Sequence, residues 1–177
     1  VNCTCLFRLI SQNHRDPNKS VSDYWPEYRC NCKEDTKVSD LLCHRAAMFG
    51  FKDGIPAGSF QDWEKFTKQL QMQAPYRKPG ISQGYHALTF GWLVGELIRR
   101  VDGRTVGAYF NEEIAAPLDI AFHIGLAESQ FERCADMLML PRENIKLPVE
   151  FLKYVPNFFL PQKLKNFKAA LLSGDFK

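Results

Sequence analysis

The chain has 177 residues, 45% of them hydrophobic and 24% charged, a balance typical of one globular domain with a sizeable core. Its formal net charge of +3 is too small to indicate a nucleic-acid partner, which usually requires a clustered basic face. The sequence contains no run of about 18 uncharged apolar residues, so we expect no integral membrane span.

The six cysteines are spread over a chain that is too large to depend on disulfides for its core. They are Cys3, Cys5, Cys30, Cys32, Cys43 and Cys134. This pattern favours free thiols in a reducing, intracellular compartment, and the first residues lack the features of a signal peptide. The compartment is otherwise open.

The first predicted helix ends with the apolar run Cys5–Ile10, before a polar turn that contains Pro17. A second helix is predicted to have Ser39 as its N-cap and to stop near Gly50.

A third helix is predicted after Asp62, whose side chain suits an N-cap. Its apolar residues recur at three- and four-residue spacing and are Trp63, Phe66 and Leu70. The helix is predicted to end before Pro75.

The strongest helical pattern lies between residues 90 and 101, where one face carries apolar side chains and the other carries charged ones. The apolar residues are Phe90, Leu93, Val94, Leu97, Ile98 and Val101, and the charged ones are Glu96, Arg99 and Arg100. The turn Pro79-Gly80 precedes this helix, and Asp102-Gly103 ends it.

Thr105 can cap a short helix that Pro117 terminates, and residues 122–126 are the best strand candidate.

The tail from Lys146 to Lys177 is basic and amphipathic, and three prolines interrupt it. We expect a solvated face there, with binding to a membrane surface or an acidic partner as the alternative.

Three longer segments occur in a recognisable order: DPNKSVSDYWPE at 16–27, VSDLLCHRAAM at 38–48 and PGISQGYHALTFGWLVGEL at 79–97. The first resembles the segment after the nucleophile helix of β-lactamase-related serine hydrolases, and the second resembles their Leu-Leu-x-His-x-x-Gly-Leu block. Ala47 stands where that block usually has glycine. With Gly103-Arg104-Thr105, the series resembles class C β-lactamases, penicillin-binding proteins and related esterases.

The resemblance implies an α+β fold in which an antiparallel sheet joins an all-helical lobe, with the active site between them. These residues cover mainly the helical lobe. We therefore expect a mainly α structure with little of the sheet, a partial β-lactamase/DD-peptidase-like fold. Residues 1–140 are assigned to the β-lactamase-related region, and 141–177 to a basic, proline-interrupted C-terminal segment of the same domain.

The resemblance gives Tyr85 a catalytic role. In such enzymes a serine and a lysine three residues later share one helix face, and a tyrosine opposite them acts as general base. Tyr85 matches that tyrosine by its distance from Pro79-Gly80. The lactamases have Tyr-x-Asn at this place, whereas this sequence has Tyr85-His86-Ala87, which favours an esterase-like relative. The alternative for Tyr85 is a buried tyrosine that anchors the loop.

His86 is the candidate substrate-binding residue, with a structural role beside the helix start as the alternative. By the resemblance, His44 maintains the fold and is not expected to be catalytic. A Cys-His hydrolase built on Cys43 and His44 is a weaker hypothesis, because adjacent helical residues point about 100° apart.

The resemblance predicts no metal and no cofactor. A four-thiolate zinc site built from the pairs Cys3-Thr4-Cys5 and Cys30-Asn31-Cys32 is an alternative. Its spacing is poor, because structural zinc pairs usually have about two to four intervening residues.

The sequence contains no Ser-x-x-Lys motif, which the resemblance places just before Val1. It also has no Lys-Thr-Gly or His-Gly-Gly triplet, and the corresponding Lys/His-x-Gly strand is expected beyond Lys177. The resemblance therefore implies a partial serine hydrolase whose parent cleaves small-molecule esters or amides through an acyl-serine intermediate. The alternative is a catalytically dead fragment or pseudoenzyme that serves as an interaction or structural domain. The substrate and the oligomeric state stay open.

Overall fold

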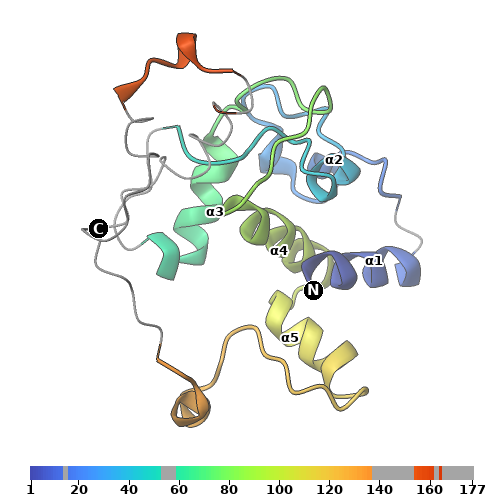
Figure 1. The fold of residues 1–177 in the computed structure, drawn as a ribbon. Coiled ribbons are helices and arrows are strands. Elements are labelled where there is room, and N and C mark those ends of the chain that lie inside the picture. Colours follow the sequence, from blue (N-terminus) through green and yellow to red (C-terminus); the bar gives the residue numbers. More distant parts are fainter. Residues whose placement is uncertain (14–15, 53–58, 137–153, 162–163, 165–177) are drawn as a thin grey trace.

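The computed structural model describes residues 1–13, 16–52, 59–136, 154–161 and 164. These residues form helices joined by turns (Figure 1). The elements are α1 (Asn2–Asn13), η1 (Val21–Asp23), η2 (Pro26–Arg29), α2 (Val38–Leu42), η3 (Ser59–Gln61), α3 (Trp63–Met72), α4 (Thr89–Asp102), α5 (Val106–Phe110), η4 (Asn111–Ala115), η5 (Glu128–Arg133) and η8 (Asn157–Phe159). Among the described residues no strand forms, and one isolated bridge joins Ser20 to Lys37. The prediction of a mainly α structure is confirmed.

Helix α4 is the element around which the others pack. It contacts α1, α2, α3 and α5, and Figure 1 shows it between α3 and α1. The predicted apolar face explains this position, because Leu93, Val94, Leu97 and Ile98 are each at most 1% exposed. Burying one such side chain is worth about 1.5 to 3 kcal/mol, so this face contributes strongly to stability.

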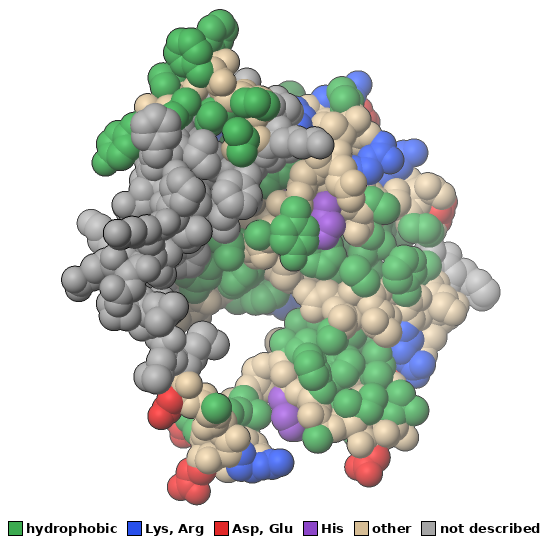
Figure 2. Space-filling view, viewed as in Figure 1, with side chains coloured by type: hydrophobic (Ala, Val, Ile, Leu, Met, Phe, Trp, Pro, Cys, Tyr) green, Lys and Arg blue, Asp and Glu red, His purple; other side chains and the backbone are tan. Residues whose placement is uncertain are grey.

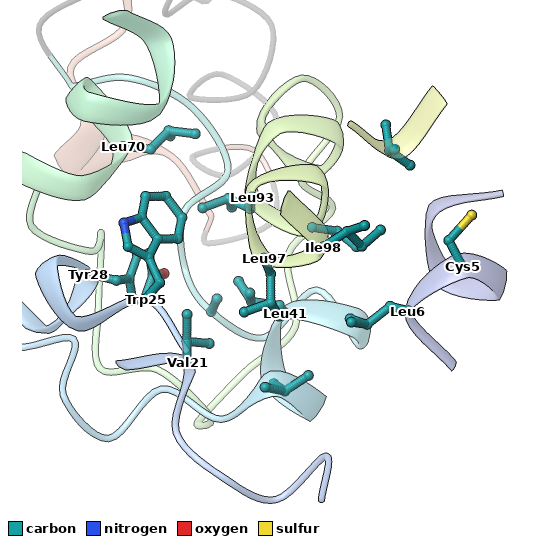
Figure 3. Close-up of a cluster of buried hydrophobic side chains, with 14 of the residues drawn as sticks. Cys5, Leu6, Val21, Trp25, Tyr28, Leu41, Leu70, Leu93, Leu97 and Ile98 are labelled. Atoms are coloured by element: carbon teal, nitrogen blue, oxygen red, sulfur yellow. The ribbon is translucent and has the colours of Figure 1, made fainter. Parts of the chain in front are cut away.

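The core beside α4 is drawn in Figure 3. Leu97 of α4 lies near Leu41 of α2, and α1 brings Leu6 to the same cluster. The rings of Trp25 and Tyr28 lie together, with centroids 5.1 Å apart. The chain between α1 and α2 thus supplies aromatic surface to a core that is otherwise made by helices.

Three helix boundaries agree with the sequence. The Asp62 carboxylate accepts a hydrogen bond from the Lys65 N–H at 2.9 Å and caps α3. Gly103 ends α4 with φ +91°, a left-handed conformation in which glycine has no steric penalty. The Thr105 hydroxyl caps α5 by accepting a hydrogen bond from the Ala108 N–H at 3.2 Å.

The second predicted helix was wrong at both ends. Helix α2 starts before Ser39, and the Asp40 carboxylate accepts a hydrogen bond from the Lys37 N–H at 3.2 Å. The helix also ends well before Gly50, because the backbone after it turns with φ +57° at His44 and φ +56° at Ala47. Two left-handed residues so close together cannot continue an α-helix.

The strand predicted over residues 122–126 was also wrong, because this segment has no strand conformation in the structure. The Phe122 N–H donates to the Ile120 carbonyl at 2.9 Å, within its own loop. The Phe122 ring packs edge-on against Phe110, with centroids 5.4 Å apart. A strand requires a neighbour for its backbone groups, and here the apolar residues pack against the end of α5 instead.

The charged face predicted for α4 is partly buried. Glu96 is only 1% exposed and accepts hydrogen bonds from Trp63 Nε1 at 2.8 Å, Arg99 Nε at 2.8 Å and Arg100 Nε at 2.7 Å. Burial alone would raise the pKa of the Glu96 carboxyl, but the hydrogen bonds from Arg99, Arg100 and Trp63 outweigh it and lower that pKa. Glu96 therefore ties α3 to α4.

The basic tail predicted over 146–177 lies mostly outside the described residues, as does the proposed boundary at residue 140. Both stay predictions.

In the part of the chain that the structure describes, no helix has the length and apolarity needed to cross a bilayer. Figure 2 shows hydrophobic side chains on the visible surface. Phe7 and Leu118 are among the exposed large hydrophobic residues, at 55% and 66%.

Candidate active site

The segment that contains Tyr85 connects α3 to α4 and is held by the turn that follows α2. The Gly80 N–H donates to the Arg45 carbonyl at 2.9 Å, and the Gly84 N–H donates to the His44 carbonyl at 2.9 Å. These bonds join two segments about forty positions apart in the sequence. The turn after α2 therefore acts as the support of the tyrosine segment.

Tyr85 presents its side chain to solvent just before α4, and it is 70% exposed. Its ring lies against His44, with centroids 4.9 Å apart and planes inclined by 59°. The alternative of a buried anchoring tyrosine is contradicted by this exposure. The phenol is accessible on a backbone that hydrogen bonds hold in place.

His86 points the other way and is only 1% exposed. The ring Nε2 of His86 accepts a hydrogen bond from the Met48 backbone N–H at 3.0 Å, and the backbone N–H of His86 donates to His44 Nδ1 at 3.3 Å. Burial lowers the pKa of His86 to about 3, with further lowering from His44 and Arg77. The imidazole is therefore neutral at physiological pH and faces the protein interior.

Met48 is fixed at both backbone groups, a feature that the sequence did not reveal. Its N–H binds His86, and its carbonyl accepts a hydrogen bond from the buried Thr89 hydroxyl. Because Thr89 is the first residue of α4, these bonds join the helix start to the turn after α2. These bonds form only when the turn after α2 meets the start of α4, so no local sequence pattern predicts them.

Gly84 is required by close packing beside Tyr85. A Cβ atom at this position would lie 2.5 Å from the Phe49 ring, far inside van der Waals contact. Phe49 is 1% exposed and also contacts His86 edge-on, with ring centroids 5.4 Å apart. The glycine thus lets the tyrosine segment lie directly on the Phe49 ring.

Within the described part of the chain, the cysteines do not come together as a second site. All six cysteines are free thiols, and within the described ranges no group of three or more His, Cys, Asp or Glu side chains could hold a metal ion. The described cysteine pairs thus give no support to the zinc alternative. The residues His123-Ile124-Gly125 match the pattern His-x-Gly, but this segment forms a loop and not a strand.

The chain resembles known proteins over most of its length. A family model described as Beta-lactamase matches residues 1–158. The chain is 31% identical over 144 residues to a protein named Esterase/beta-lactamase LipL from Mycobacterium tuberculosis. This match covers 81% of the present chain and 33% of the relative.

Solved structures are similar as well. A penicillin-binding protein homolog from Caulobacter crescentus is 35% identical with a TM-score of 0.74, covering 78% of this chain and 37% of that one. A family VIII carboxylesterase is 36% identical with a TM-score of 0.74, covering 77% of this chain and 38% of that one. The chain thus spans about a third of the length of the relatives it matches.

Proposed function

The chain belongs to the Beta-lactamase family, and from this premise we propose that it is part of a serine hydrolase that cleaves esters or amides through an acyl-serine intermediate. In this proposal Tyr85 is the general base. The phenolate accepts the proton of the serine hydroxyl as the serine oxygen attacks the substrate carbonyl. The same group then returns the proton to the departing alcohol or amine.

The observation that carries the proposal is the exposed phenol of Tyr85 on a fixed backbone. A tyrosine ordinarily loses its proton near pH 10, so neighbouring positive charge is needed for it to act as a base near neutrality. The proposal assigns that charge to the lysine of a Ser-x-x-Lys element, which this sequence does not contain. These residues would therefore supply one side of the catalytic site.

We propose esters as the preferred substrates. Ala87 stands where lactamases have an asparagine that contacts a substrate amide. Two similar proteins carry the words esterase and carboxylesterase in their names, which supports the same preference. For His86, a direct contact with substrate would require a ring that faces solvent, and it is 1% exposed. We therefore propose that His86 supports the site from inside.

The test is the Tyr85→Phe variant of the full-length protein, assayed with a p-nitrophenyl ester of a short acid. We expect turnover to fall by about a hundredfold or more, with the fold intact, because general base catalysis is removed. Tyr154→Phe is the matched control, since Tyr154 is also exposed, at 83%. Unchanged turnover in Tyr85→Phe would remove this residue from the mechanism.

The second candidate is a catalytically dead fragment or pseudoenzyme that serves as an interaction or structural domain. Intact mass spectrometry of the native protein after treatment with a fluorophosphonate separates the two candidates. A covalent adduct on a serine of a Ser-x-x-Lys element supports the hydrolase. A native protein without that element and without an adduct supports the non-catalytic role.

A further inference from the structure

We infer that His44 is a positioning residue for Tyr85, which fixes the backbone on both sides of the tyrosine and limits where its ring can lie. The inference rests on the proposed function of Tyr85, because positioning matters for turnover only if this phenol takes part in the reaction. The positioning itself is a physical property that can be measured without any substrate.

The backbone N–H groups on either side of Tyr85 both bind His44. The Gly84 N–H donates to the His44 carbonyl at 2.9 Å, and the His86 N–H donates to His44 Nδ1 at 3.3 Å. A backbone donor that is withdrawn from water requires a partner, so these two bonds define the path of the chain through Tyr85. One residue thus holds the backbone on both sides of the tyrosine.

The imidazole of His44 also lies among the rings around Tyr85. Its centroid is 4.9 Å from the Tyr85 ring and 4.6 Å from the Phe90 ring in the first turn of α4. Both distances are those of favourable aromatic pairs. The imidazole therefore links the tyrosine ring to the start of α4, and Tyr85 cannot occupy the volume that His44 fills.

The backbone of His44 has an uncommon conformation that places its carbonyl and its ring beside the tyrosine segment. Its φ of +57° lies in the left-handed region, which non-glycine residues adopt rarely and which persists where surrounding contacts determine it. Glycine would suit the backbone but would lose Nδ1 and the ring. The left-handed turn directs the carbonyl and the side chain of one residue to the same neighbouring segment.

The bond from the His86 N–H requires an unprotonated Nδ1, and the environment of His44 favours this state. Burial lowers the pKa of His44, so its imidazole is neutral near pH 7 and carries its proton on Nε2. The titratable rings that contact His44 are those of His86, whose imidazole is also neutral, and Tyr85.

Three substitutions in the full-length protein separate the two contacts of His44. His44→Asn keeps a polar acceptor near the place of Nδ1 and tolerates a left-handed backbone, but it removes the ring. His44→Phe keeps a ring beside Tyr85 and removes the acceptor. His44→Ala removes both, and His123→Asn is the matched control on an exposed histidine.

We expect kcat to fall about tenfold in His44→Asn and His44→Phe and about a hundredfold in His44→Ala, with KM within about twofold, because a small misplacement of a catalytic group slows the chemical step. The direct readout is the ring signal of Tyr85 in a tyrosine-labelled NMR spectrum, assigned by its loss in Tyr85→Phe. This signal should shift in all three His44 variants and stay in place in His123→Asn. If His44→Ala does not fold, the other two variants still carry the test.

The two proposals fail in different ways. A Tyr85 signal and a kcat that stay unchanged in folded His44→Asn and His44→Phe overturn the positioning role, whatever Tyr85→Phe does. If Tyr85→Phe keeps full turnover while the His44 variants still move the Tyr85 signal, the proposed role of Tyr85 as general base is wrong and the positioning of its ring by His44 stands.

Discussion

The buried ring of His86 accepts a hydrogen bond from the backbone N–H of Met48, with 3.0 Å between Nε2 and the amide nitrogen. A protonated imidazole has no acceptor, so this bond exists only while the ring is neutral. Burial lowers the pKa of His86 to about 3, whereas an unfolded histidine titrates near pH 6.5. The associated stability is thus fully present above pH 6.5 and is lost as the pH falls toward 3.

We expect the free energy of unfolding to fall by about 3 kcal/mol more between pH 6.5 and pH 4 in the wild type than in His86→Gln, which has no titrating ring. Urea denaturation at a series of pH values measures this difference. His123→Gln, at an exposed position, is the matched control and should follow the wild type. An equally steep fall in His86→Gln would show that another group causes the acid sensitivity.

Ala47 has a left-handed backbone, with φ +56°, at the position where the resembling block usually has glycine. An alanine in this conformation is strained by about 1 to 2 kcal/mol, whereas glycine adopts it freely but loses more conformational entropy on folding. We expect Ala47→Gly to raise the free energy of unfolding by about 0.5 to 1 kcal/mol. Chemical denaturation provides the measurement.

Ala46→Gly is the matched control for this substitution. Ala46 is equally buried, but its φ is not positive, so glycine relieves no strain there. We expect Ala46→Gly to destabilise by about 1 kcal/mol. The explanation by strain would be wrong if the two glycine variants lost the same stability.

Lys33 is fully buried and holds the C-terminal end of α3. Its Nζ donates to the carbonyls of Cys30 at 2.8 Å, Gln71 at 2.9 Å and Gln73 at 2.5 Å. Burial lowers the pKa of Lys33 to about 8, so the amine still carries its charge at pH 7. A cation at the C-terminus of a helix also interacts favourably with the helix dipole.

We expect Lys33→Met to lower the free energy of unfolding by about 2 to 3 kcal/mol, because buried carbonyls lose their donor. Thermal and urea denaturation at pH 7 test this. Lys68→Met, on the exposed side of α3, is the control and should change stability by at most about 0.5 kcal/mol. A neutral effect of Lys33→Met would mean that water replaces the amine at these carbonyls.

Sequence patterns predicted well the features that depend on neighbours along the chain. The apolar spacing located α4, and the N-cap residues Asp62 and Thr105 located the starts of α3 and α5. The segment around Tyr85 was found by its order of residues, and the family match agrees with it. Such features are local because capping and helical periodicity act over only a few residues.

Features that depend on contact between distant segments could not be predicted in this way. The sequence pattern places Glu96 on the charged face of α4, but it does not show that Trp63 and two arginines enclose this carboxylate. The sequence of residues 122–126 predicts a strand, yet in the structure Phe122 of this segment packs against Phe110 of α5. In each case the sequence shows the residue type, and the partner lies on another element.

The candidate site shows the same division. The sequence alone determined that a tyrosine follows a Pro-Gly turn and precedes a strongly amphipathic helix. Only the tertiary structure decided that Tyr85 faces solvent, that His86 is buried, and that His44 holds the backbone on both sides of the tyrosine. The physical reason is that burial and hydrogen-bond pairing arise when the turn after α2 meets the start of α4, about forty residues further along the chain.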